Sequence, residues 1–274
     1  MPTLSVITAA YGPSARYLPE AARSVHAQRL PPDWSLEWIV QEDGDSPSLS
    51  HLFADDDLVR YHHNGLRLGI AATRNLALGR ATGTLVQNLD HDDVLLPHAV
   101  ATLVRRFEEH PIHWAVGAAD DLLEDGTRRS WDSELPFGLL AAGEVNRWAE
   151  RHGGNWAVHG GGLMMRADTL RALGGWTGIP VDDEIAALAA ISELAPGWND
   201  PEVTWLYRKH ADQTTRNSHF PGLEDTGRRI ALQRAKAIRG TVLSLADTTP
   251  GADSHEVDLG PNIRLSPEAP DLRR

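Results

Sequence analysis

Apolar residues along the first 118 positions follow two spacings, which predicts a chain that alternates between strands and helices. Short, nearly continuous apolar runs predict strands at residues 4–10, 36–41, 58–62, 84–89 and 114–118. The intervening stretches 14–29 and 97–109 carry apolar side chains on one helical face, and the second has them at i, i+3, i+4 and i+7. This alternation favours an α/β fold with a mostly parallel, Rossmann-like sheet that is flanked by helices.

The second half of the chain is less regular. Residues 120–137 are polar and predict a loop, whereas residues 203–207 alternate in polarity as a strand does. Further helices are predicted at 167–173, at the residues into which Asp182-Asp183-Glu184 lead, and at 221–245, and the Pro-, Gly- and Asp-rich residues 248–274 predict a loose tail. Six of the nine tryptophans lie between residues 131 and 205, where their rings are either core or faces for sugars or other hydrophobic acceptors.

Polar residues gather where three of the predicted strands end, at residues 8–11, 42–45 and 90–93. In open α/β sheets, ligands bind at the carboxyl ends of the strands. The three segments are therefore expected to form one cleft.

Composition excludes several classes of function. The 274 residues include 26 Lys and Arg against 38 Asp and Glu, a formal charge of −12, which disfavours nucleic acid as a partner. The chain has no cysteine, so disulfides, thiolate zinc sites and cysteine nucleophiles are excluded. We expect no transmembrane segment, because no apolar run approaches 18 residues, and the first residues lack the features of a signal peptide. A cytoplasmic enzyme is the resulting expectation.

Three carboxylates at the end of the fourth strand, in Asp90-His91-Asp92-Asp93, suggest a metal site. Close carboxylates repel one another unless a cation lies between them, and hard oxygen ligands suit Mg²⁺ or Mn²⁺. The alternative is a polar turn followed by a helix that Asp93 caps.

Six motifs follow one another along the chain: Ser5 to Gly12, Ile39 to Asp45, Gly69 to Asn75, Leu89 to Asp93, Gly174-Gly175-Trp176 followed by Asp182-Asp183, and Tyr207-Arg208 with His210, Gln213 and Thr214. In this order and spacing they resemble the motifs of the glycosyltransferase family 2 enzymes. The resemblance covers residues 3 to 215 and implies the GT-A fold. Residues 1–118 would bind the nucleotide sugar, residues 119–220 would bind the acceptor and supply the base, and residues 221–274 would form a C-terminal helix and tail.

The resemblance also implies roles for individual residues. Binding of the nucleotide sugar is expected from Thr8, Ala10, Tyr11, Glu42, Asp43, Arg74, Asp90 and His91. Binding of Mn²⁺ or Mg²⁺ is expected from Asp90, Asp92 and His210, and general base catalysis from Asp183. Contacts with the acceptor or the donor sugar are expected from His159, Gly161, Trp176 and Asp182.

The implied reaction is a metal-dependent, inverting transfer of a sugar from a nucleotide-sugar donor, expected to be a UDP-sugar, to a hydroxyl of a small molecule or glycan. Glu42 and Asp182 keep the charge of the family's motifs but change their reach by one methylene. Gln213 and Arg216 lack the tryptophan that follows them in processive polysaccharide synthases, which favours single transfers. The alternatives are a sugar-nucleotide nucleotidyltransferase, although the first turn lacks its glycine cluster, and a degenerate carbohydrate-binding module of the same fold. A dinucleotide oxidoreductase lacks support, because Gly-x-Gly-x-x-Gly is missing from that turn.

Overall fold

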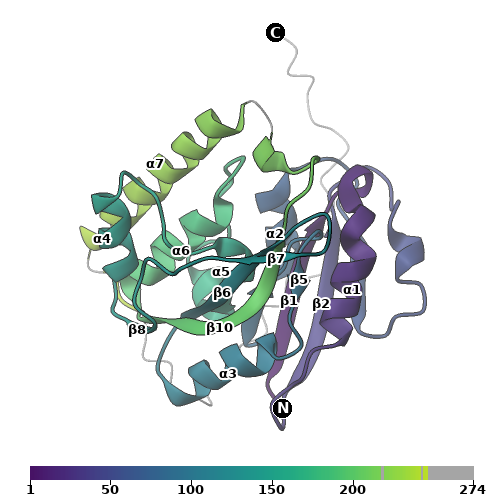
Figure 1. The fold of residues 1–274 in the computed structure, drawn as a ribbon, viewed down its shortest axis with the longest axis horizontal. Coiled ribbons are helices and arrows are strands. Elements are labelled where there is room, and N and C mark those ends of the chain that lie inside the picture. Colours follow the sequence, from purple (N-terminus) through teal and green to yellow (C-terminus); the bar gives the residue numbers. More distant parts are fainter. Residues whose placement is uncertain (217–218, 242, 246–274) are drawn as a thin grey trace, which may run out of the picture.

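A computed structural model describes residues 1–216, 219–241 and 243–245 of the chain (Figure 1). The tail expected at residues 248–274 lies outside these residues. The strands are β1 (Thr3–Ala10), β2 (Ser35–Glu42), β3 (Val59–His63), β4 (Leu85–Asn88), β5 (Val94–Leu95), β6 (Trp114–Leu122), β7 (Arg128–Ser130), β8 (Gly138–Leu140), β9 (Met164–Arg166) and β10 (Gly197–Arg208). The helices are α1 (Leu18–His26), α2 (Ile70–Leu78), α3 (Ala99–Glu109), α4 (Glu144–Arg151), α5 (Ala167–Ala172), α6 (Asp183–Leu194) and α7 (Phe220–Arg239).

Within the described residues, the ten strands form one sheet with the main order β3-β2-β1-β4-β9-β6-β10-β5. β7 pairs with β6 at one side of this path, and β8 pairs with β10. The first four strands in this order are parallel, as predicted. β9 then runs antiparallel between β4 and β6, while β6 and β10 are parallel to each other. The sheet is thus parallel in its first half and mixed in its second.

Helices cover both faces of the sheet, which explains why its central strands are apolar on both sides. On β1, Val6 packs in the core under α1 and α3, whereas its neighbour Ile7 packs in the core under α2 and α4 to α7. The predicted apolar face of α3 is confirmed, since Val100, Leu103 and the other members of that face are buried.

Three element predictions differ from the structure. The loop predicted at residues 120–137 contains the end of β6 and all of β7, because the charged residues there pair across strands, for example Asp120 with Arg128 at 2.7 Å. The helix predicted at residues 14–29 is shorter, with a 3₁₀ segment at Gly12–Tyr17 before α1. The last helix ends at Arg239, where Gly240 follows.

No helix among the described residues is both long enough and apolar enough to cross a membrane.

Candidate active site

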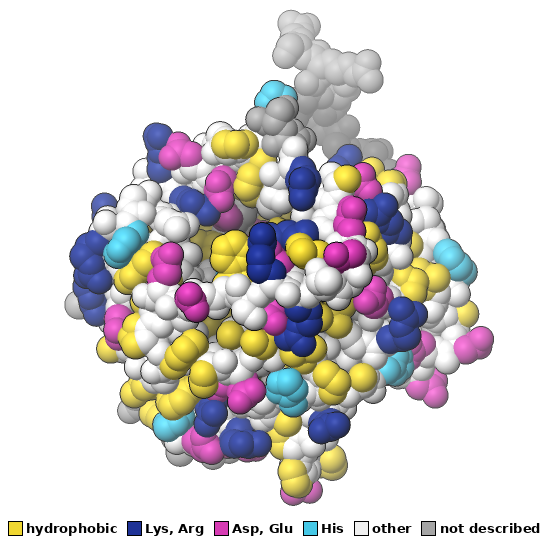
Figure 2. All heavy atoms as spheres, in the orientation of Figure 1, with side chains coloured by type: hydrophobic (Ala, Val, Ile, Leu, Met, Phe, Trp, Pro, Cys, Tyr) yellow, Lys and Arg dark blue, Asp and Glu magenta, His cyan; other side chains and the backbone are white. Residues whose placement is uncertain are grey.

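A cavity of about 730 Å³ lies at the carboxyl ends of β1, β2 and β4, as the strand-end residues predicted. The starts of α2 and α6 and the segments at residues 131–134 and 155–161 complete its wall. On the face shown in Figure 2, acidic, basic and hydrophobic side chains are interspersed and no continuous basic surface is seen. The cavity therefore suits a small ligand with both polar and apolar parts.

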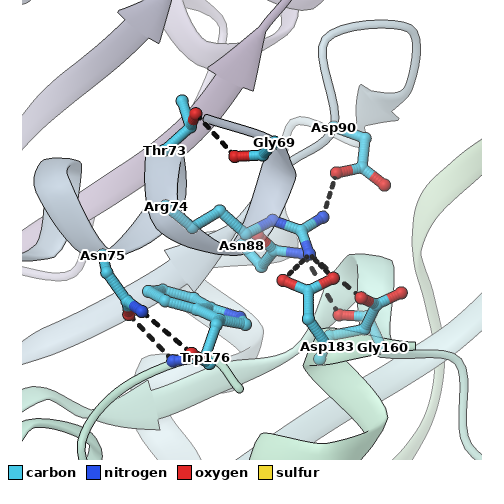
Figure 3. Close-up of polar contacts among 10 residues, drawn as sticks. Gly69, Thr73, Arg74, Asn75, Asn88, Asp90, Gly160, Trp176 and Asp183 are labelled. Atoms are coloured by element: carbon cyan, nitrogen blue, oxygen red, sulfur yellow. Dashed lines mark hydrogen bonds and ion pairs between the residues drawn. The ribbon is translucent and has the colours of Figure 1, made fainter. Parts of the chain in front are cut away.

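Arg74 of α2 holds three carboxylates together at the floor of this cavity (Figure 3). Its Nη1 donates to both oxygens of Asp183 at 2.8 Å and to Glu184 at 2.9 Å, and its Nη2 donates to Asp90 at 2.5 Å. The side chain is 1 % exposed. Arg74 was expected to contact the nucleotide or its diphosphate; its Nη1 and Nη2 are bonded to carboxylates here, whereas its buried Nε has no hydrogen-bond partner among the described residues.

The cluster carries more negative than positive charge, with one guanidinium against three acids. Burial raises the pKa of Asp183 well above its usual value, against the opposing effect of Arg74. Burial likewise raises the pKa of Asp90, and nearby Glu184 and Asp92 add to this effect. Burial alone would also raise the pKa of Glu184, but Arg74 and a hydrogen bond from Asp183 hold it below its usual value.

The predicted metal ligands only partly converge. Nε2 of His210 lies 2.9 Å from Oδ2 of Asp92, and the Asp92 side chain is 19 % exposed, whereas Asp90 is directed to Arg74. No group of three or more His, Asp or Glu side chains in the described part of the chain has the arrangement of a metal site.

Asp93 does not cap a helix, because β5 follows it and α3 begins only at residue 99. Its Oδ1 instead accepts a hydrogen bond of 2.9 Å from the backbone N–H of Arg208, and it is 1 % exposed. Burial, together with the charges of Asp92 and Asp90, raises the pKa of Asp93 well above its usual value. The helix-capping alternative is therefore wrong, and Asp93 joins β5 to the end of β10.

Several residues expected to bind the nucleotide lie together at the end of β1. Ala10, Tyr11 and His91 line the cavity, and Ser14 Oγ lies 3.3 Å from Nε2 of His91. The guanidinium of Arg67 stacks over the Tyr11 ring at 4.4 Å from its centroid.

Asp43 also lines the cavity, but its carboxylate is engaged. It accepts hydrogen bonds from the backbone N–H groups of Leu68 at 2.6 Å and Gly69 at 3.0 Å, and from Asn64 at 3.1 Å. These bonds hold the turn that enters α2, where Gly69 has a φ of 86° that favours glycine.

Thr8 and Glu42, which were expected to bind the nucleotide sugar, are not among the residues that line the cavity. Thr8 is fully buried and accepts a hydrogen bond from the indole of Trp38 at 2.9 Å. Glu42 is 2 % exposed and accepts hydrogen bonds from the hydroxyls of Ser48 and Tyr61 and from the Leu49 backbone.

The glycine-rich segment Gly160–Gly162 is required by close packing. A Cβ added at Gly160 would lie 1.9 Å from Cγ of Glu184, and one at Gly162 would lie 2.2 Å from Nε1 of Trp205. Gly161 lines the cavity beside His159, whose pKa is lowered by burial and then by Lys209.

Asp182 and Trp176, both expected to contact sugar, have different environments. Asp182 lines the cavity with φ 61° and ψ 25°, and burial raises its pKa to about 6. Trp176 is 1 % exposed and packs in the core between α2 and α6, so it does not reach the cavity. The expected contact of Trp176 with a sugar therefore has no support in its position.

Several residues of this site were not assigned from the sequence. Among them, Arg67 stacks on Tyr11, Glu184 shares Arg74 with Asp183, and Trp131 lines the cavity while remaining 53 % exposed. Three consecutive acids at a helix start and a tryptophan within a polar segment were the available indications.

Comparison with known proteins identifies a family whose sequence model this chain matches. Residues 5–174 match the family model described as glycosyl transferase family 2. A GalNAc(5)-diNAcBac-PP-undecaprenol β-1,3-glucosyltransferase of Campylobacter jejuni is 33 % identical over 118 residues, which are 41 % of this chain and 37 % of that protein. An uncharacterized protein of Sinorhizobium fredii is 28 % identical over 149 residues, 50 % of this chain and 16 % of that protein. The chain thus spans well under half the length of these relatives.

Solved structures of S. aureus TarS share the fold. TarS residues 1–349 in complex with UDP-GlcNAc superpose with a TM-score of 0.63 at 14 % identity, covering 81 % of this chain and 64 % of that one. The complex of the same residues with UDP gives a TM-score of 0.59 at 14 % identity, with coverage of 76 % and 61 %. This likeness confirms the predicted α/β, GT-A fold.

Proposed function

This chain belongs to glycosyltransferase family 2, and we propose that it transfers a sugar from a UDP-sugar to an acceptor hydroxyl, one sugar per reaction and with inversion at the anomeric carbon. The observation that carries the proposal is the cavity at the strand ends, in which aromatic, acidic and basic groups from both halves of the chain meet. Two of the solved structures that share this fold hold UDP or UDP-GlcNAc.

The donor end of the cavity is assigned to the ends of β1 and β2. Tyr11 and Arg67 form a stacked pair at its wall, which suits a planar base, and Ala10 leaves room beside them. Asp43 shapes this pocket by holding the turn before α2 through a hydrogen bond, and the residue itself also lines the cavity. His91 is proposed to contact the diphosphate or the donor sugar.

The acids present fit a divalent cation by their chemistry. Asp90 and Asp92 offer hard oxygen ligands and His210 offers an imidazole nitrogen, a donor set that suits Mn²⁺ or Mg²⁺. The excess negative charge around Arg74 also favours a cation there. When bound, such an ion stabilises the charge that develops on a diphosphate leaving group.

Asp183 is the proposed general base. An inverting displacement needs a base that removes the proton from the acceptor hydroxyl, and a raised pKa brings a carboxylate closer to the range where it does this well. Arg74 fixes the carboxylate through both of its oxygens and can stabilise it after it loses a proton. Arg74 and Glu184 are thus proposed to position Asp183.

The alternatives predict different chemistry. A sugar-nucleotide nucleotidyltransferase would release pyrophosphate from UTP and a sugar 1-phosphate, whereas the proposed enzyme would release UDP from a UDP-sugar. A degenerate carbohydrate-binding module would bind a glycan and release neither product.

The proposal is tested with a panel of UDP- and GDP-sugars in the presence of Mn²⁺, measuring melting temperature and release of the nucleoside diphosphate. A bound donor at 100 times its Kd adds about 2.7 kcal/mol to stability, which raises the melting temperature by several degrees. If no donor stabilises the protein and none is hydrolysed, the proposed activity is refuted.

A further inference from the structure

An exposed tryptophan lies in the wall of the cavity on the side opposite the proposed nucleotide pocket. Trp131 follows β7, which pairs with β6, while β1 and β2 lie beyond β4 and β9 in the sheet order. Figure 1 shows β7 and the segment after it crossing in front of the sheet. Trp131 is 53 % exposed although it lines the cavity, so its ring offers apolar surface to a ligand.

The orientation of this ring is supported from behind. The guanidinium of Arg129 lies 4.9 Å from the centroid of the Trp131 ring. Arg129 is held in turn by Asp121 of β6, which is 1 % exposed and whose Oδ2 lies 2.5 Å from its Nη2. One part of the ring is therefore covered by an anchored cation, and the rest remains accessible. A tryptophan side chain has only two χ angles, so it binds a ligand at low cost in conformational entropy.

Apart from Arg129, the charged groups that follow the ring in the cavity wall are hydrogen-bond acceptors. Asp132 and Glu134 follow Trp131 in the same wall. Across the cavity, Asp182 and Glu224 both lie near Arg228, at 3.6 Å and 2.5 Å, so that one cation faces two acids. Because Arg129 is paired with Asp121, the four acids on this side are opposed in the cavity lining by Arg228, so negative charge prevails and an anionic ligand would be repelled.

We propose that Trp131 is an acceptor-binding residue whose ring stacks on the C–H face of a neutral saccharide. Asp132 and Glu134 accept hydrogen bonds from the hydroxyls of that saccharide, and the same charges disfavour phosphorylated, sulfated or sialylated acceptors. The inference rests on the proposed function, because it assigns the acceptor class of the same site.

The test uses the full chain with UDP and Mn²⁺ on an array of immobilised glycans that end in neutral hexoses or N-acetylhexosamines, next to matched glycans that carry sialic acid, sulfate or phosphate. The parent protein is expected to retain neutral glycans. Trp131→Ala should weaken this binding roughly tenfold or more, and Trp131→Phe should restore much of it. Phe137→Ala removes another exposed aromatic ring from the same segment, one that does not line the cavity, and should change little.

Separate readouts distinguish the possible failures. Melting temperatures show whether each variant is folded, and a UDP titration of the parent tests the donor site by itself. A parent protein that fails to bind UDP would contradict the proposed function. If the parent binds UDP but retains anionic glycans preferentially, retains no neutral glycan, or is unaffected by a folded Trp131→Ala, the inference about Trp131 is overturned.

Discussion

Replacing Asp183 by asparagine tests the proposed mechanism most directly. The substitution keeps the size and one acceptor oxygen of the side chain but removes its ability to take a proton. Transfer should slow by roughly 10²–10⁴-fold, the usual contribution of a general base, which corresponds to about 2.7–5.4 kcal/mol in the activation free energy. Donor affinity should stay near the parent value, because the base meets the acceptor hydroxyl and not the diphosphate.

The structure also bounds the effect of this substitution on stability. Asp183→Asn weakens a charge-assisted hydrogen bond to Arg74, worth about 1.5–3 kcal/mol, but Glu184 and Asp90 still hold the guanidinium. It also removes the cost of burying an acid whose pKa is raised. Because these effects oppose each other, the melting temperature should change by only a few degrees.

The assay measures release of UDP from the UDP-sugar at saturating donor, with water or an acceptor glycan, alongside UDP affinity by calorimetry. Asp182→Asn is the matched control, since Asp182 lines the same cavity and asparagine tolerates its left-handed backbone conformation. Glu184→Gln should be much milder than Asp183→Asn, because glutamine still accepts the bond from Arg74.

Two results would refute this reasoning. A folded Asp183→Asn protein with near-parent rates, together with an inactive Asp182→Asn protein, would assign the base to the neighbouring residue. If all three variants transferred sugar normally, the start of α6 would be structural and His159, which lines the same cavity, would be the next candidate.

Three further predictions follow from the same contacts. If Asp92 binds the metal, Asp92→Asn should abolish most of the Mn²⁺ dependence of UDP affinity in calorimetry, whereas the effect of Asp93→Asn on that dependence should be milder. Equal UDP affinity of the parent with Mn²⁺ and with excess chelator would contradict the metal site. Gly162→Ala should destabilise the protein by about 1–3 kcal/mol in urea denaturation because its Cβ would overlap a tryptophan ring, while Gly178→Ala, with open space around it, should be nearly neutral. The pKa of Asp182 rises from 3.8 to about 6 on folding, so this acid stabilises the folded state below pH 4 and loses that contribution as pH rises through 6. Asp182→Asn should therefore be more stable than the parent at pH 8 but not at pH 4, by at most about 3 kcal/mol. Equal melting-temperature differences at both pH values would be inconsistent with this reasoning.

The sequence by itself determined the class of fold and the location of the site. Apolar runs long enough for a strand buried on both faces marked β1, β2 and β4, and the helical spacing in α3 marked its buried side, because burial is periodic over a few neighbouring residues. The same local order brought the polar strand ends of β1, β2 and β4 to one cavity, since parallel strands share their carboxyl edge.

Tertiary structure decided which of the polar residues face that cavity and which partners they have. Arg74 and Asp183 are 109 positions apart, and nothing in their local patterns indicates that the arginine would bind carboxylates. Thr8 and Glu42 lie in motifs at the strand ends, yet packing turns both side chains away from the cavity. Contacts of this kind depend on how distant elements pack, and periodicity in a short window reports only which residues are buried, not which residues they meet.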